Sequence, residues 1–206
     1  MSIYELKPKF QALLRPLTVA LARGSVTANQ VTIAAAVVSV ALGVFVAWRV
    51  PERWPFLIIP LWMFLRMAFN AIDGMLAREF GQKSRLGAYL NELTDVISDA
   101  ALYLPFALVP PFSPLWTGIV IVLAVISEFA GVLGPAAGAS RRYDGPMGKS
   151  DRAFVFGALG LMIGLSDALP DWVGYVMPLL AAALVLTIVN RVRNGLREGA
   201  SGHLPR

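Results

Sequence analysis

The sequence predicts an all-α membrane protein that crosses the bilayer six times and carries one amphipathic helix ahead of the first crossing. Only 15% of its 206 residues are charged, whereas an ordinary soluble domain carries about 25%. Hydrophobic residues make up 57% of the chain, and its mean hydropathy is +0.65. They gather in blocks close to the roughly 20 residues that a helix needs to span a bilayer. Composition and block length together exclude a soluble enzyme and a disordered chain.

Residues 1–23 form the first expected element, a helix lying along the cytoplasmic surface of the membrane. Apolar side chains recur there at helical spacing, with basic ones among them: Tyr4, Leu6, Phe10, Leu13, Leu14 and Leu17, together with Lys7, Lys9 and Arg15. Such a helix can turn its apolar side to the acyl chains and its basic side to anionic headgroups. The alternative is a helix packed on the protein's own cytoplasmic face.

Residues 24–193 are expected to form a six-helix bundle, followed by a cytoplasmic tail over residues 194–206. We expect apolar spans at about residues 30–49, 54–77, 87–109, 113–136, 152–167 and 171–190. The stretches between them read as short turns and loops rather than as linkers between domains. The chain is therefore expected to be one membrane domain.

Basic residues set the predicted orientation, because positive charge resists translocation across a membrane. Of the 18 lysines and arginines, 15 fall on one side of the predicted spans: Lys7, Lys9, Arg15, Arg23, Arg78, Lys83, Arg85, Arg141, Arg142, Lys149, Arg152, Arg191, Arg193, Arg197 and Arg206. Only Arg49 and Arg53 fall on the other side, and Arg66 lies inside the second span. We expect a multi-pass protein of the inner (cytoplasmic) membrane with both termini cytoplasmic.

The chain has no cysteine and a single histidine, His203, which lies in the polar C-terminal tail. Disulfides, thiolate metal sites and cysteine nucleophiles are therefore excluded, and histidine-based catalysis is disfavoured. Any catalysis must use carboxylates, amides, hydroxyls and guanidinium groups.

Polar side chains concentrate at the cytoplasmic ends of the second and third spans, where ionisable groups are costly and by default mark a functional site. Asn70 and Asp73 are three residues apart and share one face of the second span. The third span carries a stripe at steps of four: Gly87, Asn91, Asp95 and Asp99. Because the two spans run antiparallel, these side chains can meet near the turn at residues 78–86. Oxygen ligands alone suit Mg²⁺ or Mn²⁺; the alternative is that they only bond neighbouring helices.

Asp99 allows two interpretations, because it lies about 6 Å beyond Asp95 along the third span at 1.5 Å per residue. It can add charge to the metal site or act as a displaced base. It can instead form a salt bridge with Arg66, which lies at a similar depth on the second span, and we favour this pair. Glu128 in the fourth span is a further candidate partner for Arg66.

The stretch from Asn70 to Asp95 resembles the signature of the CDP-alcohol phosphotransferase family, D-x2-D-G-x2-A-R-x8-G-x3-D-x3-D. The spacing matches throughout, and six of the eight fixed residues are present: Asp73, Gly74, Ala77, Arg78, Gly87 and Asp95. Asn70 and Asn91 replace the first and third aspartates, which we take as a subfamily feature. The resemblance extends over the six spans and the N-terminal helix.

This resemblance implies an enzyme that transfers a phosphatidyl group from CDP-diacylglycerol to an alcohol and releases CMP, with Mg²⁺ or Mn²⁺ as cofactor. Asp95 would be the general base, and the metal-binding positions would be Asn70, Asp73, Asn91 and Asp95. Positions matching CDP-contacting residues are Gly74, Arg78 and Ser84, with a weaker match at the start of the first span for Asn29 and Thr32. Because amides carry no charge, we expect one tight metal ion and a weak second one.

The acceptor is less defined. Basic residues on the cytoplasmic side suit a phosphorylated acceptor such as glycerol phosphate or inositol phosphate: Arg141, Arg142, Lys149, Arg152, Arg191 and Arg193. Lys149 and Arg152 lie in a stretch that resembles a pocket-lining loop of the family. Equally, these charges can simply set the topology and bind anionic lipid. The resemblance also implies a homodimer, and nothing in the sequence points to a nucleic-acid partner.

Two other functions compete with the enzyme. A catalytically silent family member could bind a CDP-linked lipid or a partner protein, and a small transporter could use the polar ladder as an ion path. Asp95 and Arg78 argue against the silent protein, because a base beside a phosphate-binding arginine serves catalysis. The ladder is confined to one end of the bilayer, which argues against the transporter.

Overall fold

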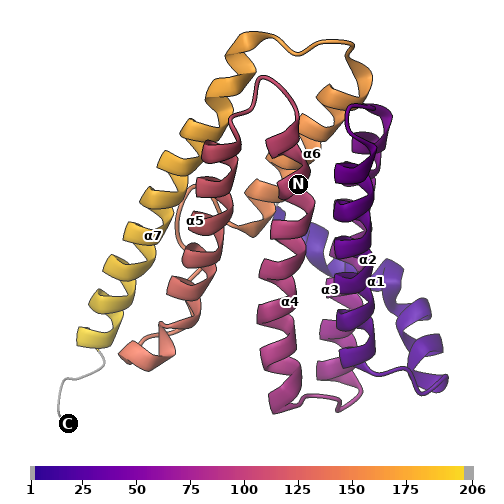
Figure 1. Ribbon diagram of the computed structural model, residues 1–206. Helices are drawn as coiled ribbons and strands as arrows, with labels where there is room; N and C mark the ends of the chain where they lie inside the picture. Colours follow the sequence, from indigo (N-terminus) through magenta and orange to yellow (C-terminus); the bar gives the residue numbers. More distant parts are fainter. Residues whose placement is uncertain (1–2, 202–206) are drawn as a thin grey trace.

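The structure, a computed structural model, describes the backbone of residues 3–201 and the side chains of residues 9–200. Over this range every regular element is helical, as Figure 1 shows. The α-helices are α1 (Ile3–Arg23), α2 (Ala28–Arg49), α3 (Ile58–Glu79), α4 (Arg85–Tyr103), α5 (Pro114–Val132), α6 (Lys149–Leu165) and α7 (Val176–Ser201). Short 3₁₀ turns lie between them: η1 (Trp54–Leu57), η2 (Leu104–Leu108), η3 (Pro135–Ala137) and η4 (Asp171–Tyr175).

Local sequence signals start the two helices that meet at the polar end of the molecule. Thr27 caps α2, because its hydroxyl accepts from the Gln30 N–H at 3.2 Å while the Gln30 side chain accepts from the Thr27 N–H at 2.9 Å. Ser84 caps α4 by accepting from the Gly87 N–H at 2.9 Å. Each cap satisfies N–H groups that the first turn of a helix leaves without partners. The first turns of α2 and α4 thereby become rigid platforms for polar side chains.

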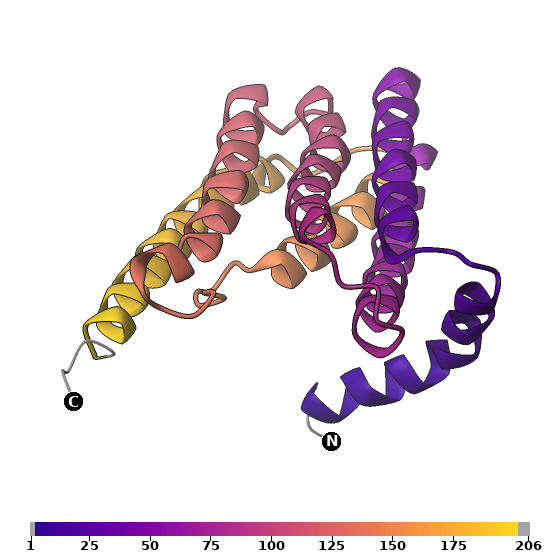
Figure 2. The same cartoon turned by 90° about the horizontal axis from the view of Figure 1, so that it is seen from below.

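α4 occupies the middle of the bundle, between α2 and α5 (Figure 2). α3 packs along α2 on one side and against α6 on another, and α7 packs along α5. Gly43 permits the close approach of α2 and α4, because a Cβ atom there would clash with the Ala101 carbonyl. Aromatic side chains fill the centre, where the Tyr103 and Phe156 rings stack with centroids 3.7 Å apart. α3 and α4 thus carry their polar ladders into the same region, above an apolar core.

Four helical segments of the described chain are long and apolar enough to cross a membrane: Ala28–Arg49, Trp54–Glu79, Pro114–Val132 and Asp171–Ala200. α4 and α6 lie where the other two spans are predicted but do not meet the same measure. α6 has only 17 residues, and the 19 residues of α4 include four charged ones: Arg85, Glu92, Asp95 and Asp99. Six crossings therefore stay a prediction.

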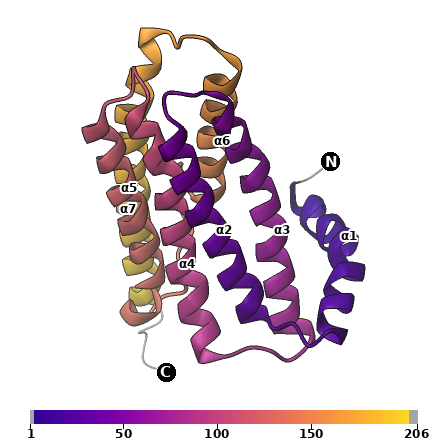
Figure 3. The same cartoon turned by 45° about the vertical axis from the view of Figure 1, so that its right-hand side comes forward.

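The two ends of the chain add detail to the expected domain. α1 lies beside α3 (Figure 3), and the Arg15 guanidinium pairs with the Glu79 carboxylate at 2.7 Å. Leu13 and Leu17 of α1 are exposed, so α1 has apolar side chains that could contact a membrane. That α1 lies in the membrane surface stays a prediction. α7 is helical as far as Ser201, which includes most of the expected tail. Outside the residues whose side chains are described lie Tyr4, Leu6, Lys7, His203 and Arg206.

Candidate active site

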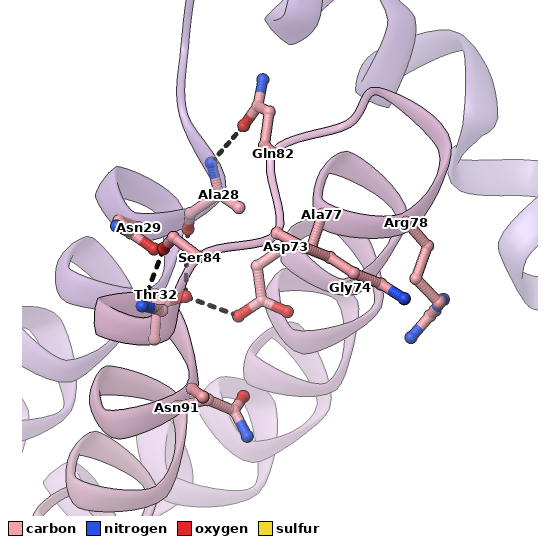
Figure 4. Close-up of a pocket in the computed structure, with 13 residues that line it drawn as sticks. Ala28, Asn29, Thr32, Asp73, Gly74, Ala77, Arg78, Gln82, Ser84 and Asn91 are labelled. Atoms are coloured by element: carbon pink, nitrogen blue, oxygen red, sulfur yellow. Dashed lines mark hydrogen bonds between the residues drawn. The ribbon is translucent and has the colours of Figure 1, made fainter.

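A cavity of about 350 Å³ opens where α2 and α4 begin and α3 ends (Figure 4). It brings together seven of the residues that the sequence predicts for the site: Asn29, Thr32, Asp73, Gly74, Arg78, Ser84 and Asn91. They come from three helices and the loop before α4. The structure therefore gathers six of the eight signature positions and the start of α2 around one space, whereas Asn70 and Asp95 are not among the residues that line it.

Asp73 is the buried carboxylate of this cavity, with only 7% of its surface exposed. The Thr32 hydroxyl donates to its Oδ2 atom at 2.8 Å, as Figure 4 shows. A buried carboxylate is costly unless its lone pairs are used, and Asp73 makes no ion pair within the described chain. Thr32 therefore orients Asp73, and the remaining bonding capacity of the carboxylate is open to a ligand.

The glycines of the signature make room at the cavity wall. A Cβ atom on Gly87 would lie 2.8 Å from Asn29 Oδ1 and 3.0 Å from Ser84 Oγ, so these two polar side chains would have to move to admit a side chain there. A Cβ atom on Gly74 would lie 3.1 Å from an Arg78 guanidinium nitrogen. Glycine at position 87 leaves room for Asn29 and Ser84 beside α4, and glycine at position 74 leaves room for the Arg78 guanidinium beside α3.

Arg78 is exposed and makes no hydrogen bond or ion pair with any described residue. A guanidinium presents a planar fork of donors that matches two oxygens of a phosphate group. In Figure 4 its side chain extends from the end of α3 beside Gly74. An unpaired arginine at a cavity mouth is thus equipped to bind an anionic ligand.

Gln82 is a cavity residue that sequence reasoning missed. Its Oε1 atom accepts from the Ala28 N–H at 2.7 Å, and its Nε2 atom donates to the Val26 carbonyl at 3.4 Å. These bonds tie the loop before α4 to the first turn of α2. No sequence signal could reveal this, because Gln82 falls among the eight unspecified positions of the signature.

Asp95, the predicted base, lies beside the cavity rather than among the residues that line it. Its Oδ1 atom accepts from Arg66 at 3.1 Å, and its Oδ2 atom pairs with the Lys149 ammonium. Arg66 also donates to the Asp95 carbonyl at 3.0 Å. The carboxylate is therefore held from one side by a buried guanidinium and covered from the other by a lysine whose side chain is 34% exposed.

Deeper in the bundle, five charged side chains form what we call the buried ionic cluster: Arg66, Asp99, Glu128, Arg152 and Arg191. Arg66 pairs with Asp99 at 2.5 Å, which confirms the favoured interpretation of Asp99. Arg152 pairs with Asp99 at 3.1 Å and with Glu128 at 3.0 Å. The prediction that Glu128 is a further partner of Arg66 is wrong. Glu128 on α5 meets Arg152 and Arg191 instead, because α4 and Asp99 stand between α5 and α3.

Lys149 and Arg152, which the sequence offers as acceptor-binding residues, have different surroundings. Both belong to the first turn of α6. Lys149 reaches Asp95 near the surface, whereas Arg152 is 1% exposed and points into the buried ionic cluster. One turn of helix therefore supplies one accessible and one enclosed cation.

The four residues predicted to hold a metal ion lie only partly together, because Asp73 and Asn91 line the cavity whereas Asn70 and Asp95 are not among its lining residues. No group of three or more Asp, Glu, His or Cys side chains that could hold a metal occurs within the described residues. Asp73 and Asp95 are near enough for their charges to interact, and the amides of Asn70 and Asn91 make no hydrogen bond within the described chain. Carboxylate and amide oxygens are the kinds of ligand that suit Mg²⁺ or Mn²⁺, but both carboxylate oxygens of Asp95 are paired with Arg66 and Lys149 in this structure.

Comparison with known proteins gives consistent matches. The family model described as CDP-alcohol phosphatidyltransferase matches residues 25–189. Inner membrane protein YnbA of Escherichia coli (strain K12) is 41% identical over 200 residues, which are 97% of this chain and 99% of that protein. Phosphatidylinositol phosphate synthase of Mycolicibacterium smegmatis is 28% identical over 190 residues, or 87% of this chain and 82% of that enzyme.

Solved structures with a similar fold include those of a phosphatidylinositol phosphate synthase. The Mycobacterium tuberculosis phosphatidylinositol phosphate synthase with CDP-DAG bound has a TM-score of 0.69 and 26% identity, covering 93% of this chain and 96% of that one. The same enzyme in complex with manganese and citrate has a TM-score of 0.70 and 25% identity, covering 93% and 91%.

Proposed function

Because the chain belongs to the CDP-alcohol phosphatidyltransferase family and is a multi-pass membrane transferase of phospholipid biosynthesis, we propose that it transfers a phosphatidyl group from CDP-diacylglycerol to an alcohol and releases CMP. The cavity at the ends of α2, α3 and α4 carries this proposal. It joins a buried carboxylate, Asp73, to an unpaired arginine, Arg78, and leaves room for a nucleotide between them. A solved relative with CDP-DAG bound supports the same class of donor.

The reaction is a displacement at the phosphorus atom that carries diacylglycerol. The acceptor hydroxyl forms a new oxygen–phosphorus bond, the bond from that phosphorus to the bridging oxygen of CMP breaks, and the hydroxyl proton passes to a base. Such reactions depend on positioning and on neutralising charge. Arg78 would hold diphosphate oxygens, while Asn29, Gly74 and Ser84 would hold the nucleotide against the helix ends.

Asp95 would be the general base that takes the hydroxyl proton. Arg66 fixes the carboxylate through Oδ1 and the backbone carbonyl, so that Oδ2 faces the accessible side. Lys149 covers Oδ2 in this structure, and its partly exposed side chain can give way to an acceptor hydroxyl. The buried ionic cluster behind Arg66 keeps this arrangement rigid.

We propose Mg²⁺ or Mn²⁺ as cofactor, held by Asp73 with Asn70, Asn91 and Asp95. A solved relative contains manganese. When bound, the ion would draw charge from the diphosphate and make CMP a better leaving group. The position of Asp73 at the cavity wall, oriented by Thr32, is what the chain contributes to this step.

The membrane arrangement completes the proposal. We propose six crossings with the cavity and both termini on the cytoplasmic side, and α1 lying in the membrane surface with Leu13 and Leu17 towards the acyl chains. A homodimer is expected from the family resemblance. This arrangement gives a lipid donor access from the bilayer and gives soluble products access to the cytoplasm.

The test is CMP release from CDP-diacylglycerol by the purified full chain, with Mg²⁺ or Mn²⁺ and a panel of alcohols. We expect CMP release that depends on both the metal ion and an alcohol, and we expect Asp95→Asn to abolish it while CDP-diacylglycerol still binds. Tight binding of CDP-diacylglycerol by the unmodified chain with no CMP release from any alcohol would instead support the catalytically silent alternative.

A further inference from the structure

One cation of the cavity, Lys83, has no role in the proposed reaction. It lies in the turn between α3 and α4 and is one of the residues that line the cavity. Lys83 is exposed, and it makes no hydrogen bond or ion pair with a described residue. An ammonium group carries a full positive charge and three donors. An unpaired one that lines a cavity is therefore available to an anionic ligand.

The neighbours of Lys83 hold the backbone of this turn in place. On one side, the Gln82 Oε1 atom accepts from the Ala28 N–H at 2.7 Å, which joins the turn to the start of α2. On the other side, the Ser84 hydroxyl accepts from the Gly87 N–H at 2.9 Å, which joins the turn to the start of α4. The backbone of Lys83 is thus fixed beside the cavity, while its side chain remains free to bind a ligand.

Two nearby cations differ from Lys83 in their position. Arg23 at the end of α1 and Arg85 at the start of α4 are also exposed and also lack a partner among the described residues. Neither of them lines the cavity. Such surface charges need no ligand to explain them, because basic residues gather on the cytoplasmic side of membrane proteins. Lys83 differs because it lines the same cavity as Arg78.

The charges that line the cavity favour an anion with more than one negative charge. The charged residues among those that line it are one carboxylate, Asp73, and two cations, Arg78 and Lys83, so their net charge is +1. Asn91 adds no charge, and Asp95 lies beside the cavity with both oxygens already paired. A diphosphate diester carries a negative charge on each phosphate. One guanidinium cannot balance both charges, and Lys83 supplies the second cation.

We propose that Lys83 is a second diphosphate-binding residue, which acts with Arg78 on the two phosphates of the donor lipid. An ammonium group acts as a point charge rather than as a planar fork, so Lys83 adds affinity for the phosphates whereas Arg78 also orients them. Because both cations belong to the protein, the diphosphate binds even when no metal ion is present. The inference rests on the proposed transferase function and adds a residue to the same site.

The experiment measures the binding of CDP to the purified full chain in phosphatidylcholine nanodiscs that contain EDTA. Neither a metal ion nor an anionic headgroup then competes with the ligand or the cations. We expect the unmodified chain to bind CDP, and its affinity to fall as the salt concentration rises. We expect Lys83→Gln to weaken binding by about tenfold, the effect of losing one charged hydrogen bond, and to reduce the salt dependence. Lys83→Arg should restore most of the affinity, because it keeps the charge.

Arg85→Gln is the matched control, because it removes one positive charge two residues along the chain from a position that does not line the cavity. It should change the affinity for CDP by less than about twofold, since water and salt screen a charge outside the site. Lys83 has no bond to a described residue that its loss would break, so the thermal midpoint of Lys83→Gln should match that of the unmodified chain.

Three results would overturn the inference. They are unchanged CDP binding in Lys83→Gln, an equal loss in Arg85→Gln, and CDP binding by the unmodified chain that is absent in EDTA or independent of salt. The last of these needs no variant to fold. None of the three bears on the transferase function, which CMP release from CDP-diacylglycerol decides separately. A chain that binds CDP through Lys83 but releases no CMP with any alcohol would keep this inference and overturn the transferase.

Discussion

The cavity and the buried ionic cluster both contain carboxylate and guanidinium groups and share helices α3 and α4, yet they differ in how many of these groups are already paired. In the cavity, Arg78 and Asn91 make no bond with a described residue, and Asp73 accepts from the Thr32 hydroxyl without forming an ion pair in the described chain. In the buried ionic cluster every charged group meets an opposite charge. Unused bonding capacity is what we expect of the region proposed to bind a ligand, and ion pairs between helices are what we expect of the region that holds the helices together.

Asp95 lies at the border between the two regions. Arg66 joins it to the buried ionic cluster, and Lys149 and its electrostatic interaction with Asp73 join it to the cavity. A general base needs both a fixed position and access to its proton donor. The border position would give Asp95 both in its proposed role as the general base.

The largest expected effect comes from opening the buried ionic cluster. Arg152→Ala removes the guanidinium between Asp99 and Glu128 and leaves two buried carboxylates short of a partner. We expect a loss of about 3–5 kcal/mol in the free energy of unfolding, seen as poor yield of folded protein and a much lower thermal midpoint in detergent. Arg141→Ala, which breaks a partly exposed pair with Glu92, is the matched control and should cost far less.

Asp73→Asn tests the cavity by removing charge without changing shape. We expect CMP release to fall by about 100- to 1000-fold, the size typical of losing one electrostatic contact in a reacting site. The thermal midpoint should stay the same or rise, because Asp73 has no cationic partner to strand. Asp144→Asn, in the loop that follows α5, is a control for activity. Unfolding of Asp73→Asn with full activity in the folded fraction would contradict the contrast between the two regions.

How far the sequence predicted these regions depends on what helix periodicity can and cannot report. Spacings of three and four residues predicted four side chains around one space, and Asp73 and Asn91 line it while Asn70 and Asp95 do not. Residue depth correctly paired Arg66 with Asp99. Periodicity gives the face of one helix, however, and not the rotation of one helix about another. The pairing of Glu128 with Arg152 and Arg191 depends on how α5, α6 and α7 pack, so it was out of reach.

The number of membrane crossings shows the same limit. The apolar blocks located all six helices of the bundle, and α4 and α6 begin within two or three residues of the predicted third and fifth spans. Whether α4 crosses depends on how its charges are neutralised, and this is decided by Arg66 and Lys149 on other helices rather than by the composition of α4 itself. A measure taken on one helix at a time does not include this neutralisation, and six crossings stay a prediction.

Asp99→Asn tests whether Asp99 belongs to the buried ionic cluster rather than to the reacting site. Arg66 keeps Asp95 and Arg152 keeps Glu128 in this variant, so we expect a moderate loss of about 1–3 kcal/mol in stability. The specific activity of the folded fraction should stay within a few-fold of the unmodified chain. Activity lost with stability kept would move Asp99 into the reacting site and contradict its role as a structural partner of Arg66.

Adding a negative charge to the cavity should have a smaller effect, and it should raise the affinity for metal ions rather than lower it. We expect Mn²⁺ titration of the unmodified chain, without nucleotide, to show one tight site, because amides at positions 70 and 91 leave a second ion poorly compensated. Asn91→Asp adds a carboxylate at the cavity wall and should tighten a second site by about tenfold, since ligand charge tunes affinity for hard cations. Two equally tight sites in the unmodified chain would contradict the donor assignment.

The smallest expected effect comes from breaking an exposed ion pair, which shows how much stability pairing gives without burial. Arg15 and Glu79 pair at 2.7 Å, as closely as the members of the buried ionic cluster, but their side chains are 57% and 35% exposed. Water already solvates both charges, so Glu79→Gln should change the free energy of unfolding by only about 0.2–1 kcal/mol and less at high salt. A thermal midpoint measured at two salt concentrations checks this. A loss as large as that of Arg152→Ala would mean that pairing alone, without burial, makes these arginines structural.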